Sequence, residues 1–134
     1  MPMNLHTTYL RIRDDASVEP LPVDDTFWPR LIAGELGTFH REQLVTVLEH
    51  GEDWPNWEMH PSGDEIVVLL DGHMTFVLEL DGGVDEVELG HVGDFIVVPR
   101  GIWHTARIRR PSRAMFITPG EGTLSRAAQP RGED

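Results

Sequence analysis

Cysteine is absent from this chain of 134 residues. Its absence excludes disulfide bonds, zinc sites built from thiolates and a cysteine nucleophile. Disulfides belong mainly to oxidising compartments, so a chain without cysteine fits a cytoplasmic protein. We therefore expect a cytoplasmic localisation.

Lysine is absent as well, because all 11 basic residues are arginines, against 23 Asp and Glu. No lysine is available to form a Schiff base or to bind nucleotide phosphates in a P-loop. The net charge of −12 repels nucleic-acid phosphates and anionic lipid headgroups. We expect neither nucleic acid nor a membrane among the partners.

Long hydrophobic runs are also missing. No apolar run approaches the roughly 18 residues of a membrane-spanning helix. The opening stretch MPMNLHTTYLRIRDD lacks the charged start and apolar centre of a signal peptide. The composition, 40% hydrophobic and 25% charged, is ordinary for a globular protein, and the length favours one domain.

From residue 44 onward, short β-compatible stretches alternate with turn residues, and no stretch between the turns has a helical period. The predicted strands are Leu44–Glu49, Trp57–His60, Glu65–Leu70, Met74–Leu80, Val84–Leu89, Phe95–Val98, Trp103–Ile108 and Ala114–Thr118, with Asp71-Gly72 as a hairpin turn. Turns at intervals of roughly eight to twelve residues are typical of an all-β sandwich or barrel.

The two ends of the chain differ from this pattern. Residues 1–43 read as an N-terminal arm, with a strand over Leu5–Ile12, a loop over residues 14–25 and a short helical turn ending near Ile32. Residues 44–120 form the predicted barrel. Residues 121–134 have little to bury and are predicted to be a mobile tail.

Four ligand-type side chains stand at informative spacings. Glu58 and His60 are two residues apart, so on a strand they point to the same face. A tight return of the chain can bring Glu65 beside them, and the turn Pro99-Arg100-Gly101 can deliver His104 from a distant strand. Two imidazoles and two carboxylates on an inner face suit a divalent first-row metal. The same residues could instead be polar side chains at strand ends.

These spacings resemble the two motifs of the cupins, G-x5-H-x-H-x3,4-E-x6-G and G-x5-P-x-G-x2-H-x3-N. The second motif reads Gly93-x5-Pro99-x-Gly101-x2-His104 here, and the first reads Glu58-x-His60-x4-Glu65-x6-Gly72. The resemblance covers residues 44–120. It implies a jelly-roll barrel, also called a double-stranded β-helix, with a divalent metal such as Fe, Mn, Zn or Ni.

The resemblance implies His60, Glu65 and His104 as metal ligands, and Glu58 only by position, because the family has a histidine there. The leading glycine is one place early, and Ile108 is not the expected asparagine beyond His104. Glu58 could bind the metal or act as a base beside a two-histidine, one-carboxylate triad, which suits iron(II) and oxygen. Three further histidines flank turns and are expected to face solvent: His50, His73 and His91.

Because one fold hosts many chemistries, two functional classes stay open. The first is a metal-dependent enzyme acting on a small organic molecule, such as a dioxygenase, isomerase or decarboxylase. The second is a non-catalytic module that binds or senses a small ligand, with or without metal. We also expect a homodimer in which the strand over Leu5–Ile12 joins the partner's sheet and covers its edge.

Overall fold

The computed structural model describes residues 2–128 and contains one helix and nine strands in that range. The helix α1 spans Phe27–Ile32. The strands are β1 (Thr8–Ile12), β2 (Val18–Pro22), β3 (Gln43–His50), β4 (Asn56–Met59), β5 (Glu65–Leu80), β6 (Gly83–Leu89), β7 (Phe95–Val98), β8 (His104–Pro119) and β9 (Leu124–Ala127). The prediction of an all-β jelly roll with a short N-terminal helix is confirmed.

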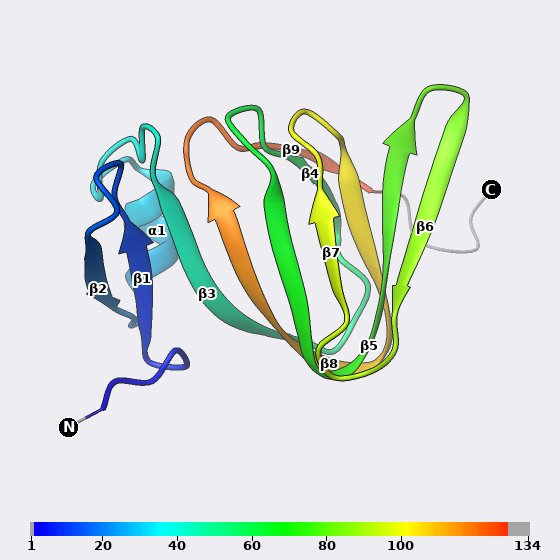
Figure 1. Ribbon diagram of the computed structural model, residues 1–134, viewed down its shortest axis with the longest axis horizontal. Helices are drawn as coiled ribbons and strands as arrows, with labels where there is room; N and C mark the ends of the chain where they lie inside the picture. The colour runs from blue at the N-terminus through cyan, green and yellow to red at the C-terminus, as the bar shows by residue number, and fades with distance from the viewer. Residues whose placement is uncertain (1, 129–134) are drawn as a thin grey trace.

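Two long strands form the spine of the fold. β5 and β8 pair antiparallel almost from end to end, and both bend sharply halfway, so the sheet folds into the deep trough seen in Figure 1. Along β8 the sheet continues in the order β3, β1 and β2 on one arm, and through β4 to β9 on the other. β6 and β7 pair with the opposite edge of β5. Among the described residues, the outermost strands do not pair with one another, so the sheet bends around its core without closing.

Strand alternation places an apolar core inside the trough. On either side of the bend, the inward-facing residues of β5 and β8 are mostly buried, and the apolar cluster includes Val67, Leu69, Phe76, Ala106 and Phe116. A smaller cluster lies where α1 covers the inner face of β1 and β3, with Phe27 in edge contact with Tyr9. The core thus holds the two halves of each long strand in a fixed bend.

The expected hairpin at Asp71-Gly72 is wrong, because the chain continues through this pair as one strand. Gly72 has φ of +96° and sits at a β-bulge, where the register with β8 shifts. A Cβ atom at Gly72 would lie 2.6 Å from the carbonyl oxygen of Pro111 and closer still to Ser112 Oγ. The glycine therefore permits two backbones to meet at the bend.

The N-terminal arm also departs from expectation. β2 lies within the segment read as a loop, and β1 is hydrogen-bonded on one side to β2 and on the other to β3 of its own chain. The expected addition of Leu5–Ile12 to a partner's sheet is therefore wrong, because both edges of β1 are covered within the chain. Before the helix begins, Asp24 accepts hydrogen bonds from the amide and hydroxyl of Thr26.

The C-terminal segment contains a strand that the sequence pattern did not predict. β9 pairs with β4 from Asn56↔Ala127 to Met59↔Leu124. The guanidinium of Arg126 stacks over the rings of Trp57 and Trp103, at 5.4 and 4.5 Å, and forms an ion pair with Glu79. The mobility predicted for residues 121–134 stays a prediction, and residues 129–134 lie outside the described range.

Candidate metal centre

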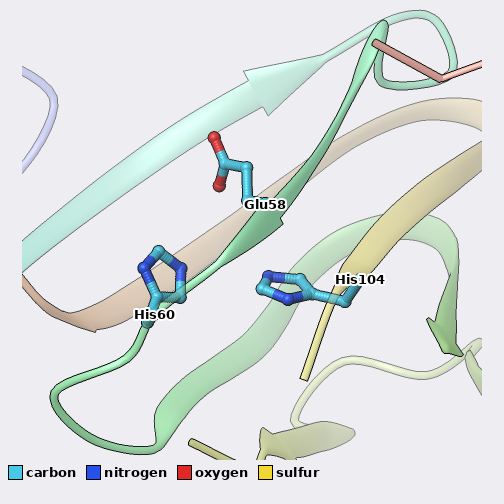
Figure 2. Close-up of side chains that lie close together, drawn as sticks. All are labelled: Glu58, His60 and His104. Carbon is cyan, nitrogen blue, oxygen red and sulfur yellow. The ribbon is translucent and has the colours of Figure 1, made fainter. Parts of the chain in front are cut away.

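Strand pairing brings the two motifs together at one point. Glu58 of β4 lies directly opposite His104, the first residue of β8, so both side chains point to the inner face. His60 follows β4 on the same face. One ligand-type atom from each of Glu58, His60 and His104 lies within 4.8 Å of the others, and Figure 2 shows the three side chains close together. The structure thus brings together residues that the sequence separates.

The loops that deliver these residues are tied to each other. Gly101 adopts φ of +76°, a conformation that favours glycine, and its amide donates to the carbonyl oxygen of His60 at 3.0 Å. The amide of Arg100 donates to Asp64 Oδ1 at 2.8 Å. The turn before β8 therefore fixes the chain around His60, and Pro99 follows the last residue of β7 as expected.

His104 is completely buried, and its surroundings fix the orientation of its ring. Its Nδ1 lies 3.1 Å from the carbonyl oxygen of Ile102, which can only accept, so Nδ1 carries the proton. Nε2 then faces Glu65 Oε1 at 3.1 Å. Burial alone would lower the pKa of His104, but the hydrogen bond and charge of Glu65 raise it above its ordinary value. Nε2 is the atom directed to the site.

Glu65 is the buried anion of the site, with 2% of its surface exposed. Burial alone would raise the pKa of its carboxyl, but the hydrogen bond from His104 and the nearness of His60 lower it to about 2. Its second oxygen accepts a hydrogen bond from the Thr118 hydroxyl at 2.6 Å. Glu65 is therefore ionised at neutral pH and held rigidly, as a carboxylate ligand requires.

The pKa of Glu58 is shifted in the opposite direction to that of Glu65. Burial raises the pKa of its carboxyl, and the negative charge of Glu65 raises it further, while His60 and His104 act against the shift. Two carboxylates and two imidazoles thus share one pocket. A bound cation would remove the repulsion between the two carboxylates. In the absence of a cation, a proton on Glu58 would remove it.

His60 is also buried, and only one of its ring nitrogens is hydrogen-bonded. Nδ1 lies 2.9 Å from the Thr123 hydroxyl, whereas Nε2 is buried without a hydrogen-bond partner in the described part of the chain. Nε2 is 3.4 Å from Glu65 Oε1, a contact too poorly aimed to count as a hydrogen bond. A buried imidazole nitrogen that lacks a partner, next to a second imidazole and two carboxylates, fits a divalent metal ion.

Two hydroxyls that orient the candidate ligands were missed by the sequence reading. Thr118 and Thr123 lie far along the chain from the residues they contact, and no motif marks them. Among the turn histidines, His91 is exposed as expected, but the expectation is wrong for His73, which is 8% exposed and bonded to Glu88 at 2.7 Å. His50 packs against Trp54 and Phe116, and its Nε2 is buried without a partner among the described residues.

A surface hollow of about 650 Å³ lies beside β8, between the segment 52–57 and residues 105–108. None of the four candidate ligands lines it. Trp54 does, and its ring also packs 6.2 Å from that of His104, centroid to centroid. This indole therefore stands between the hollow and the candidate metal centre.

Comparison with known proteins settles the family. Residues 44–120 match the family model described as Cupin domain, which is more than half of the chain. The chain belongs to the cupin family. Within the described residues, no helix is long and apolar enough to cross a membrane.

Two curated relatives are both acireductone dioxygenases of Rhodopseudomonas palustris, from strains TIE-1 and ATCC BAA-98 / CGA009. Each is 39% identical over 84 residues, which is 60% of this chain and 46% of the relative. The chain thus spans about half the length of the curated relatives it matches.

Among solved structures, an oxalate oxidase superposes with a TM-score of 0.52 at 13% identity, covering 61% of this chain and 45% of the oxidase. A cupin-2 domain protein of Shewanella frigidimarina gives a TM-score of 0.49 at 18% identity, covering 57% and 70%. At these identities the oxidase supports the fold alone.

Proposed function

We propose that this cupin is a metal-dependent dioxygenase acting on a small organic molecule, with His60, Glu65 and His104 as metal ligands and Glu58 as the fourth. The observation that carries the proposal is the buried Nε2 of His60, which has no hydrogen-bond partner among residues 2–128 and lies near His104, Glu58 and Glu65. The 39% identity to acireductone dioxygenases favours oxygen chemistry over isomerisation or decarboxylation.

The roles of the protein groups follow from their surroundings. Glu65, ionised and held by Thr118, supplies a fixed negative charge, and His60 and His104 would each supply an imidazole nitrogen. A divalent metal bound there would supply the activation of dioxygen that a two-histidine, one-carboxylate set favours. Glu58, whose pKa is raised by burial and by Glu65, is placed to accept a proton from a substrate hydroxyl when it does not bind the metal.

Metal loading followed by oxygen uptake tests this function. The full chain, loaded with Fe²⁺, Mn²⁺ or Ni²⁺, is mixed with a panel of small enediols and phenols that includes acireductone, and oxygen consumption is followed with an electrode. We expect uptake with at least one metal and substrate, and none with His104→Ala. Metal binding at one ion per chain without uptake across the panel would refute the dioxygenase and leave a metal-bound binding module.

One observation favours the second candidate function, a binding module without catalytic activity. The candidate ligands are buried or half-buried, and the hollow of about 650 Å³ is lined by other residues. A metal ion held in this way can stabilise a ligand-binding barrel without turnover. The same oxygen electrode separates the two functions, because a binding module stabilised by metal consumes no oxygen.

We further propose a homodimer formed through the outer face of the sheet. Directly paired residues share a face, and the centre of the face opposite the core is apolar, with polar residues only towards the ends of β3 (Gln43, and Glu49 paired with Arg113). The apolar residues are Leu10, Val45, Val47, Ile66, Val68, Phe95, Val97, Met115 and Ile117. Phe95 and Val97 are 63% and 46% exposed. Such an extended apolar face suits a second copy, which could cover it through two-fold symmetry.

Light scattering on a sizing column tests the dimer. Phe95→Glu combined with Val97→Glu should yield monomers, while Val84→Glu, at a residue 59% exposed on β6, should not change the mass. A wild-type monomer at micromolar concentration would refute the dimer. Enzymatic activity in the monomeric variant would show that each site is complete in one chain.

A further inference from the structure

The C-terminal strand approaches the candidate ligands closely. β9 pairs with β4, the strand that carries Glu58 and leads into His60. Ser125 lies directly opposite Glu58, so residues at odd positions of this segment face the inside of the trough. Thr123, two residues earlier, is on that same face, and its hydroxyl lies 2.9 Å from His60 Nδ1.

The hydroxyl of Thr123 decides which ring nitrogen of a neutral His60 carries the proton. A neutral imidazole carries its proton on one nitrogen and a lone pair on the other, and only the lone pair can bind a metal. If Nδ1 donates to Thr123 Oγ1, the lone pair is on Nε2, the buried nitrogen that lies next to Glu65 and has no hydrogen-bond partner in the described part of the chain. If the hydroxyl donates instead, Nε2 carries the proton and cannot bind.

The surroundings of Nε2 favour the first arrangement. A proton on Nε2 would need an acceptor, but the nearest one, Glu65 Oε1, is at 3.4 Å in poor alignment and is already 3.1 Å from His104 Nε2. A buried N–H group without an acceptor costs roughly 1–3 kcal/mol. A proton on Nδ1 meets the Thr123 oxygen at a normal distance and avoids that cost.

We propose that Thr123 is the positioning residue of His60: it accepts the Nδ1 proton and leaves the Nε2 lone pair directed into the metal site. β9 holds Thr123 in place through its pairing with β4 and through Arg126, which stacks on Trp57 and Trp103. The C-terminal strand is thus a part of the metal centre, although it contributes no ligand. This proposal rests on the proposed metal-binding function.

Two substitutions isolate the hydroxyl. Thr123→Val keeps the shape of the side chain and removes the oxygen, and Thr123→Ser keeps the oxygen and removes the methyl group. Loss of a hydrogen-bond partner behind a metal-binding histidine typically weakens metal affinity about 10–100-fold. Calorimetric titration with Ni²⁺ should therefore show at least a tenfold weaker affinity for Thr123→Val and near wild-type affinity for Thr123→Ser.

Ser125→Ala is the matched control, because Ser125 is the next inward-facing hydroxyl of the same strand and lies opposite Glu58. It should not weaken Ni²⁺ binding as Thr123→Val does. A loss of less than about fivefold in Thr123→Val, well below the range for such partners, would overturn the proposal. An equal loss of Ni²⁺ affinity in Thr123→Val and Thr123→Ser would also overturn it, as would an equal loss in Thr123→Val and Ser125→Ala. In either case the weaker binding would come from a loosened β9 and not from the missing hydroxyl.

A second readout does not require metal. In the chelator-treated full chain, ¹⁵N NMR of the imidazoles identifies which nitrogen of His60 carries the proton, and His60→Ala assigns the signals. We expect protonation at Nδ1 in the wild type and in Thr123→Ser, and a shift towards Nε2 in Thr123→Val. If wild-type protein binds no Ni²⁺, the proposed function fails, and this spectrum alone decides about Thr123: protonation at Nε2 in the wild type would overturn its role.

Discussion

Replacing Gly72 by alanine tests how the long strands pass the bend. The new Cβ would lie 2.6 Å from the Pro111 carbonyl oxygen and 2.6 Å from Ser112 Cα, both backbone atoms, and closer still to Ser112 Oγ. That hydroxyl cannot simply rotate away, because it accepts from the amide of His73 and donates towards the carbonyl oxygens of His73 and Arg110. The backbone of β8 must therefore move.

The magnitude follows from two contributions. A left-handed backbone conformation costs a residue with Cβ about 1–2 kcal/mol, and forcing atoms into an already packed region costs about 1–3 kcal/mol more. Gly72→Ala should therefore lower the free energy of unfolding by about 2–5 kcal/mol. Gly82 is the matched control: its φ is +85°, but nothing lies within 4 Å of an added Cβ. Gly82→Ala should cost only about 1–2 kcal/mol.

Urea unfolding of both variants, followed by tryptophan fluorescence and by circular dichroism, gives the two free energies. The difference between them measures the close contacts with Pro111 and Ser112. Equal destabilisation in the two variants would refute the close approach of β5 and β8 at this bulge. Two transitions that do not coincide would mean that the arms of the trough unfold separately.

Three further outcomes are expected. His60→Ala and His104→Ala should each lose bound metal in elemental analysis of the purified protein while keeping the wild-type circular dichroism spectrum, and full stoichiometry in either would remove that residue from the site. Glu58→Gln should weaken metal binding, because an amide is a poorer donor to a hard cation. The metal-free variant should resist heat at least as well as the wild type, because the repulsion between the buried carboxylates of Glu58 and Glu65 is removed. Unchanged metal affinity together with lost turnover would instead identify Glu58 as the base. Burial lowers the pKa of His50 below its ordinary value of 6.5 in the folded protein, so as the pH falls the unfolded chain protonates this imidazole first. The free energy of unfolding should therefore decrease as the pH falls from about 7 through the unfolded pKa towards the lower folded pKa. Urea unfolding should show a smaller decrease in His50→Gln, and identical pH dependence in both proteins would contradict the burial of this ring.

The elements predicted correctly from the sequence share a local cause. Alternating apolar residues marked the strands that build the trough, and the spacing from Gly93 to His104 marked a turn that the structure confirms. Glu58 lies near His60, and Glu65 lies 3.4 Å from it, because period-two alternation and a short return determine which face they share, while their role as metal ligands stays a prediction. These inferences need only the nearest residues along the chain.

The elements that the sequence pattern missed depend on distant partners. Asp71-Gly72 has the composition of a hairpin turn, but the glycine is required by Ser112, 40 residues away, and not by a reversal of the chain. β2 contains Pro20 and Pro22, which argue against a strand unless it lies at an edge, as it does here. β9 is short and exposed, so its pairing with β4 leaves no hydrophobic signal.

The candidate centre joins segments that are far apart in the chain. His104 and Glu65 are separated by 39 residues, Thr118 and Glu65 by 53, and Thr123 and His60 by 63. Closing such long loops costs entropy before any contact repays it, so β-rich topologies of this kind fold slowly, in roughly milliseconds to seconds. The centre can therefore form only after β5 has paired with β8 and β9 has docked on β4. If the proposed metal binds, recovery of metal binding during refolding should follow the last of these steps, and it would then report the completed topology and not the early collapse of the chain.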